Sequence, residues 1–262
     1  MSKVLGNTAR KYGKHRPSVV LVHGGPGAAG ELAPLAKLLA ARGFGVLEPF
    51  QTGTSVDAQI AELRDFLQAL NRPVALVGWS WGAWLALMVA TRNPELLSRL
   101  VLIGCPPFLA EDARSINATR MARLSPAAQD QWDQWMPRLE QPGVMDQAMT
   151  LFDTTDCFAR DDSPRPKVCF DPDIHHQVWA EAAALRRNKA LIVELTRLRL
   201  PVLALHGDYD PHPADAVQRS LRLHQPKAAF HLLQNCGHKP WQEVHAKSSF
   251  LTLLCAGLPR QA

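Results

Sequence analysis

The sequence predicts an α/β fold with a doubly wound, mostly parallel sheet and one long, mainly helical insertion. Three observations predict it. Short apolar runs rich in β-branched residues alternate with segments of helical periodicity, as in parallel sheets whose two faces are both covered by helices. This alternation stops after Gly104 and resumes only near residue 202. The length, 262 residues, suits one large domain that carries an insertion.

The expected strands are continuous apolar runs, and helical patterns separate the first of them. The runs are SVVLV (18–22), FGVL (44–47), VALVG (74–78), LVLIG (100–104), VLALHG (202–207) and AFHLL (229–233). Helices are expected over 31–43, which ends on a glycine, over 57–70, which begins at Asp57 as N-cap, and from Trp81 to a proline stop at Pro94. Strand and helix therefore alternate as they do in βαβ units.

The insertion interrupts this order for about ninety residues, a length that in compact domains is usually functional. We therefore predict an α/β core at 1–105 and 191–262 and a helical cap at 106–190. The segment 106–178 holds 12 acidic and 7 basic residues, although the whole chain has a net charge of +5. The cap is thus expected to be acidic on a basic body, a feature that a merely solvated acidic surface also explains.

Composition excludes several classes of protein. Apolar residues make up 47% and charged residues 20%, an ordinary globular balance. The longest apolar stretch, 83–90, is too short to cross a bilayer, and the first residues lack the apolar core of a signal peptide, so no membrane and a cytoplasmic location are expected. The basic residues Arg10, Lys11, Lys14 and Arg16 are interpreted as a solvated tail, and nucleic acid is not an expected partner.

The cysteine pattern does not predict a disulfide framework. The five cysteines form an odd set without a CxxC pair or zinc spacing. We expect reduced, mostly buried thiols and neither a disulfide nor a metal site.

The stretch GWSWG (78–82) follows an expected strand and opens an expected helix, which is the context that a GxSxG nucleophile elbow requires. The serine of such an elbow occupies a strained turn, and only very small residues fit two positions before and after it. Gly78 and Gly82 meet this demand around Ser80. Close packing of strand and helix with an incidental serine is the alternative.

The loop HGGPGAAG (23–30) lies directly after the first expected strand. In acyl transfer, the tetrahedral intermediate carries an oxyanion that preorganised backbone N–H groups stabilise. We expect these donors to be the N–H groups of Trp81 and Gly25, while His23 hydrogen-bonds within the loop. A plain Gly-Pro turn is the alternative; the phosphate-loop pattern GxxxxGK[ST] is absent.

An acid and a base are expected downstream. The strand VLALHG runs into GDYDPHP, and we assign Asp210 as the acid with Asp208 in reserve, although both could simply form a turn. His238, in NCGHKPW, has the right chain order for the base. His206 lies on the strand beside the acid, and His245 is expected inside the last helix.

Two further histidines, His175 and His176, lie near Asp171 and Asp173, but this spacing matches no familiar metal site. No metal and no organic cofactor are therefore predicted.

Together these residues predict a serine hydrolase. Asp210 would fix the tautomer of His238, His238 would take the proton of Ser80, and Ser80 would attack a carbonyl whose oxyanion lies at the N–H groups of Trp81 and Gly25. Water would then release the acyl group.

The motifs HGGPG, GWSWG, GDYD and CGHKPW, in this order, resemble the α/β-hydrolase superfamily over nearly the whole chain, from Ser18 to Leu254. HGGPG with SWG is most similar to the prolyl aminopeptidase (proline iminopeptidase) branch. The resemblance implies an α/β-hydrolase fold, a serine hydrolase and a helical cap after the sixth strand.

Three departures from that branch bear on substrate. Trp79 replaces a glycine of GGSWG and either shapes the pocket floor or fills the core. Thr52 replaces an arginine in the stretch after the loop, which keeps Gln51 and Gly53. Met136 stands where the branch has a glutamate that binds the substrate's amino group. Other carboxylates of the cap, namely Glu140, Asp133 and Asp153, are candidates for that role.

The leading hypothesis is thus a serine hydrolase acting on a small ester or amide, including an N-terminal aminoacyl bond. A carboxylesterase or thioesterase without aminopeptidase activity is the second, favoured by Met136. A non-catalytic ligand receptor on the same fold is the third. The expected partner is a small molecule or a short peptide, and oligomeric state is left open.

Overall fold

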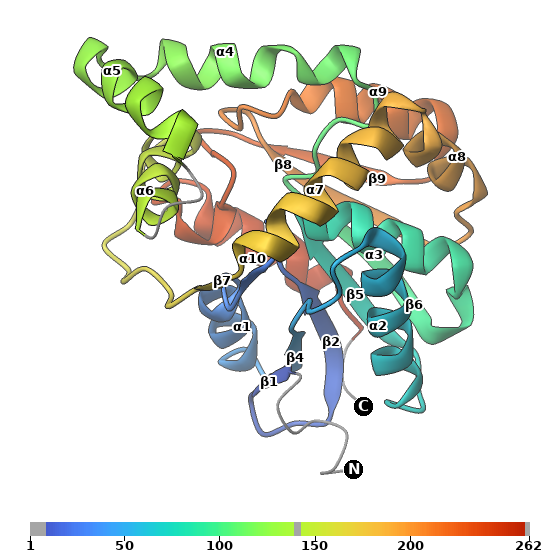
Figure 1. The fold of residues 1–262 in the computed structure, drawn as a ribbon. Helices are drawn as coiled ribbons and strands as arrows, with labels where there is room; N and C mark the ends of the chain where they lie inside the picture. Colours follow the sequence, from blue (N-terminus) through green and yellow to red (C-terminus); the bar gives the residue numbers. More distant parts are fainter. Residues whose placement is uncertain (1–8, 139–142, 260–262) are drawn as a thin grey trace.

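The predicted fold class is confirmed by a seven-stranded sheet with helices on both faces (Figure 1). The structure, a computed structural model, describes residues 9–138 and 143–259. The strand order is β1-β4-β2-β5-β6-β8-β9; β1 pairs antiparallel with β4, and the other pairs are parallel. The strands are β1 (Ala9–Tyr12), β2 (Pro17–Val22), β4 (Gly45–Pro49), β5 (Val74–Trp79), β6 (Leu97–Ile103), β8 (Val202–Gly207) and β9 (Ala229–Leu233).

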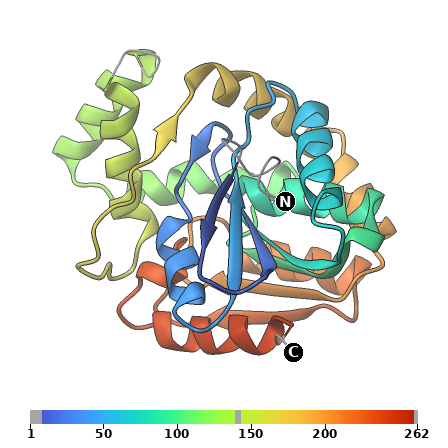
Figure 2. The same ribbon diagram turned by 90° about the horizontal axis from the view of Figure 1, so that it is seen from below.

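Alternating side chains of the central strands pack into two separate hydrophobic cores. On β2, Val19 and Leu21 join one buried cluster, and Val20 and Val22 join the other. The first cluster packs under α1 (Ala33–Ala40) and α10 (Lys247–Gly257). The second packs under α2 (Val56–Gln68), α3 (Trp81–Arg92), α8 (Ala190–Arg197) and α9 (Ala214–His224). Figure 2 shows α1 and α10 on the side of the sheet opposite to α2. This two-sided burial explains the continuous apolar strands.

The segment between β6 and β8 is mainly helical. It contains α4 (Ser115–Ala122), α5 (Pro126–Trp135), α6 (Val144–Asp156) and α7 (Pro172–Arg187), and its short strand β7 (Cys169–Phe170) pairs with β3 (Ala28–Ala29) of the loop after β2. Figure 1 shows α4, α5 and α6 standing away from the sheet and α7 crossing beside it. The buried side chains of α7 join the cluster under α3. The cap boundaries at 106 and 190 stay a prediction.

Three local predictions were wrong. Arg10 and Lys11 belong to β1, not to a solvated tail, because their backbone groups pair with β4 at the sheet edge. The N-cap of α2 is Ser55, whose Oγ accepts a hydrogen bond from Ala58 N at 3.1 Å, two residues before the expected Asp57. His245 lies in a turn before α10 and not within it.

The expectation of mostly buried thiols holds for only two of the five cysteines. All five cysteines are free; Cys105 and Cys236 are buried, and Cys169 is exposed. No helix within the described part of the chain has the length and apolarity to cross a membrane.

A buried carboxylate ties the end of α6 to the segment before α10. Glu243 has no exposed surface, and its Oε1 accepts hydrogen bonds from Gly237 N at 2.7 Å and Phe158 N at 2.9 Å, while Oε2 accepts one from Ala159 N at 2.8 Å. The backbone adds to this connection, since Val244 N donates to Ala159 O at 2.8 Å. Two segments far apart in sequence are therefore joined by the Glu243 side chain and by a backbone hydrogen bond.

The substitution Glu243→Gln tests this connection between the two segments. The amide NH₂ would face at least one backbone N–H, so a buried donor would lose its acceptor, and we expect the free energy of unfolding to fall by about 1–3 kcal/mol in urea titrations. Glu95→Gln makes the same chemical change at an exposed carboxylate and serves as control. Equal stability of the two variants would contradict the structural role given to Glu243.

Candidate active site

The turn between β5 and α3 holds Ser80 in a conformation that few non-glycine residues adopt. Its φ is 54° and its ψ is −124°. A Cβ on Gly78 would overlap the carbonyl of Gly82, and a Cβ on Gly82 would overlap the carbonyl of Val22. The two glycines therefore let strand, turn and helix approach closely, and the turn projects Ser80 from the end of the sheet.

The loop after β2 lies against this turn. A Cβ placed on Gly24 would come within 3.1 Å of the Cβ of Ser80. Gly25 has a φ of +39°, and its carbonyl accepts a hydrogen bond from Ala28 N at 2.9 Å. His23 hydrogen-bonds within the loop as expected, with Nδ1 at 2.8 Å from Gly24 O, and burial lowers the pKa of His23 to about 4.

Glutamine side chains hold this loop and the start of α3 together. The indole Nε1 of Trp81 donates to Gln51 Oε1 at 2.9 Å and to Gln59 Oε1 at 3.2 Å. The amide of Gln51 in turn donates to His23 O at 2.9 Å. The two segments expected to supply the oxyanion donors, at Gly25 and Trp81, are thus held in one buried network.

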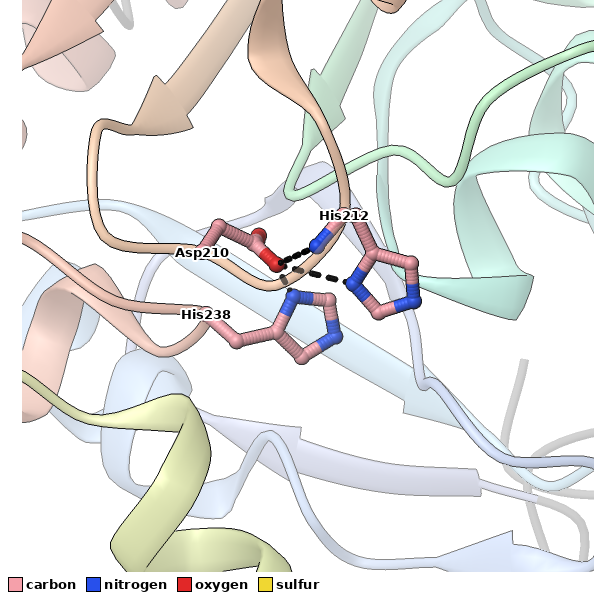
Figure 3. Close-up of side chains that lie close together, drawn as sticks. All are labelled: Asp210, His212 and His238. Atoms are coloured by element: carbon pink, nitrogen blue, oxygen red, sulfur yellow. Dashed lines mark hydrogen bonds and ion pairs between the residues drawn. The ribbon is translucent and has the colours of Figure 1, made fainter. Parts of the chain in front are cut away.

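Asp210 and His238 lie together beyond the ends of β8 and β9 (Figure 3). His238 Nδ1 is 2.7 Å from Asp210 Oδ2, so the ring can donate to the carboxylate. Gly104, after β6, makes room for the pair: a Cβ there would come within 2.9 Å of His238 Nδ1 and 3.2 Å of Asp210 Oδ2. This is the arrangement in which a carboxylate fixes an imidazole tautomer.

A second imidazole shares the same carboxylate. Asp210 Oδ1 lies 2.8 Å from His212 Nδ1 and accepts His212 N–H at 2.9 Å, and the rings of His212 and His238 lie 4.5 Å apart at a 30° tilt (Figure 3). His206 Nε2 is 3.5 Å from Asp210 Oδ2. Burial raises the pKa of Asp210, but His238, His212 and His206 outweigh it and hold that pKa well below its usual range. Burial lowers the pKa of His212 to about 4.

Asp210, His212 and His238 also form a group of potential metal ligands, with ligand atoms within 4.8 Å of one another. Two ligands of one tetrahedral zinc ion, each about 2.1 Å from the metal, would stand about 3.4 Å apart. The nitrogen–oxygen distances of 2.7 Å and 2.8 Å are instead those of hydrogen bonds. The geometry therefore fits a hydrogen-bonded set and not a metal centre.

A cavity of about 170 Å³ opens over these residues, and Ser80, His238, His212 and Gly25 all line it. The ionic side chains in its wall are paired. Lys239 Nζ lies 3.0 Å from Glu31 Oε1 and 2.7 Å from Asp153 Oδ1. Arg120 binds both carboxylate oxygens of Asp156, at 2.8 Å through Nε and 2.5 Å through Nη2.

Trp79 and the cap both hold the backbone of His238. The indole Nε1 of Trp79 donates to His238 O at 2.8 Å, and His238 N donates to Asp156 O at 2.7 Å. Trp79 also lines the cavity, and its ring lies 5.1 Å from the ring of His238. Both alternatives raised for Trp79 therefore apply, since it is buried and also forms part of the pocket wall.

Other residues considered in the sequence lie elsewhere. The carboxylate of Asp208 accepts Cys236 N–H at 3.0 Å, His245 contacts the ring of Phe158, and Asp171 caps α7. Asp133 and Met136 are exposed. Glu140 lies outside the described residues.

Sequence reasoning missed His212, Lys239 and Glu31. His212 carried a usable signal, because an aspartate in a turn often accepts the N–H two residues on. Lys239 and Glu31 carried none, since their pairing with each other and with Asp153 joins three distant parts of the chain.

The comparisons with known proteins agree with this architecture. A family model described as "Alpha/beta hydrolase family" matches residues 19–247. The chain is 25% identical over 174 residues to a pimeloyl-[acyl-carrier protein] methyl ester esterase of Nitrosomonas europaea. That alignment covers 64% of this chain and 65% of the relative, so it spans slightly less than two thirds of that protein.

Solved structures share the fold. The crystal structure of VinJ superposes with a TM-score of 0.71 at 22% identity and covers 96% of this chain and 95% of VinJ. A proline iminopeptidase of Mycobacterium smegmatis gives a TM-score of 0.65 at 19% identity, with 96% and 95% covered. The resemblance noted in the sequence is thereby confirmed at the level of the superfamily, and a proline iminopeptidase is among the structural neighbours.

The two aspartates after β8 can be separated by experiment. Asp210→Asn removes the acceptor that fixes His238, and we expect ester turnover to fall by about four orders of magnitude. Asp208→Asn perturbs only the turn at Cys236 and is expected to keep turnover within about tenfold of the unmodified protein. Steady-state kcat with a p-nitrophenyl ester measures both. A larger loss in the Asp208 variant would reverse the assignment.

Proposed function

Because the chain belongs to the alpha/beta hydrolase family, we propose that it is a serine hydrolase that cleaves a small carboxylic ester through an acyl-enzyme. Ser80 is the nucleophile, His238 the general base and Asp210 the acid that orients it. The observation that carries this proposal is the placement of Ser80: it sits in a strained turn at the wall of a cavity that His238 also lines, and His238 rests on Asp210.

The proposed reaction uses each of these groups in turn. His238 Nε2 accepts the hydroxyl proton as Ser80 Oγ attacks the ester carbonyl. The N–H groups of Trp81 and Gly25 stabilise the oxyanion, and the imidazolium then protonates the departing alcohol. Water, deprotonated by the same imidazole, attacks the acyl-enzyme and releases the carboxylic acid, which restores Ser80.

The charges in the cavity wall favour an ester over an aminoacyl amide. An exopeptidase needs a carboxylate that is available to the substrate's ammonium group. Among the described residues that line the cavity, Glu31 and Asp153 are paired with Lys239, and Asp156 is paired with Arg120. Asp153 also lies 3.3 Å from Arg165 Nε. The similarity to a methyl ester esterase supports the same choice.

Aminoacyl amide hydrolysis remains the second candidate function, because a proline iminopeptidase shares the fold and Asp153 does line the cavity. It would require the substrate's ammonium group to displace Lys239 from Asp153. A non-catalytic receptor is the third candidate, and the base and acid held in hydrogen-bonding contact argue against it.

Covalent labelling tests the nucleophile. A fluorophosphonate probe reacts with an activated serine, so we expect the unmodified protein to label at Ser80 and Ser80→Ala not to label. Ser115→Ala, which removes a serine hydroxyl outside the residues that line the cavity, is the control and should label normally. Absence of labelling in the unmodified protein would favour the receptor.

A substrate panel tests the bond that is cleaved. We expect turnover of short-chain p-nitrophenyl esters and, at equal concentration, at least about a hundredfold lower kcat/KM for prolyl and alanyl arylamides, because the wall offers no available carboxylate to an ammonium group. N-acetylated arylamides serve as controls for recognition of the amino group. Efficient cleavage of free but not of acetylated arylamides would establish the aminopeptidase instead.

A further inference from the structure

A second cavity adjoins the one over Ser80. It has a volume of about 210 Å³ and lies between the loop after β2, the helix α6 and the chain that leads into β7. Four residues line both cavities, namely Glu31, Met149, Asp153 and Lys239. The two cavities are therefore neighbours that share one wall.

The shared wall is an ion-paired cluster that joins core and cap. Lys239 Nζ bridges Glu31, from the turn before α1, and Asp153, on α6. Arg165 adds a second cation, with Nε 3.3 Å from Asp153 Oδ2. Two carboxylates thus face two cations, so the wall presents no net charge and its aliphatic stems are available for apolar contact.

The small volume of the cavity over Ser80 makes the second cavity relevant to substrate binding. At about 170 Å³ the cavity over Ser80 is smaller than the ~300–1,000 Å³ typical of small-molecule sites. The second cavity more than doubles the available space, and Ala28, Val168 and Phe170 give it apolar surface of its own. Met149 continues that surface from one cavity to the other.

We propose that the second cavity is a subsite for the distal apolar chain of the ester, which runs from Ser80 past Met149 and the stem of Lys239. This inference rests on the proposed ester hydrolysis and adds its substrate class: esters that carry an extended, uncharged alkyl chain. Short esters occupy the catalytic cavity alone and gain nothing from the subsite. Each methylene that enters the subsite adds binding energy in the transition state.

Filling the subsite tests the proposal. Val168 is 37% exposed and lines the second cavity but not the first, so Val168→Trp places an indole in the subsite. Val193, on α8, is 45% exposed and lines neither cavity, so Val193→Trp is the matched control. Val168→Phe repeats the change with a smaller ring, and thermal unfolding establishes that each variant is folded.

The readout is kcat/KM along two series: p-nitrophenyl esters from acetate to octanoate, and acetate esters of alcohols of increasing length. We expect the unmodified protein and Val193→Trp to prefer longer chains in one series, and Val168→Trp to lower the octanoate-to-acetate ratio, or its alcohol equivalent, by about tenfold or more.

The possible failures are distinguishable. Identical chain-length profiles for the two tryptophan variants, in a protein that hydrolyses acetate esters, would overturn the subsite and leave the proposed function standing. A protein that hydrolyses no ester and does not label at Ser80 would overturn the proposed function, and the subsite with it.

Discussion

The buried carboxylate of Glu243 is the constraint on which the rest of the site depends. It gathers the N–H groups of Phe158 and Ala159, at the exit from α6, and of Gly237, immediately before His238. A carboxylate buried this completely is tolerable only where backbone donors replace its water. The loop that carries His238 and the chain that follows α6 are consequently one structural unit. The N–H of His238 adds to it by donating to Asp156 O. A movement that carried the end of α6 away from the core would displace His238 as well.

Within that unit, Asp210 is the electrostatic centre. One oxygen faces His238 and the other faces His212, so the carboxylate cannot rotate without losing a hydrogen bond. Burial alone would favour a protonated acid, and the surrounding imidazoles reverse that preference. His212 stays neutral in this environment because burial penalises its cation, which leaves the negative charge of Asp210 to act on His238. Orientation and charge are therefore supplied by the same three side chains.

The sequence predicted those features of the site that depend on residues close together in the chain. The elbow, the glycine loop and the order of serine, aspartate and histidine each depend on a few consecutive positions, and the structure brings Ser80, Asp210 and His238 to one end of the sheet. The sequence could not reveal contacts between distant segments: Glu243 lies 85 residues from Phe158, and Lys239 lies 86 from Asp153. The wrong prediction of a solvated tail at Arg10 has the same origin, because the sequence alone does not show that Glu48 of β4 lies opposite Arg10.

The departure at Trp79 links this framework to substrate choice. A glycine at that position, as in the branch that the sequence most resembles, would offer no donor to His238 O and no ring beside His238. The indole also packs edge-on against Trp241 at 5.3 Å, so its orientation is fixed from behind. The indole holds His238, the proposed base, and also takes up space, since the same ring lines the cavity over Ser80. In the proposed reaction, a site narrowed in this way would exclude bulk close to the scissile bond. A larger substrate would then extend toward the cap, where Lys239 rather than an open carboxylate would meet it.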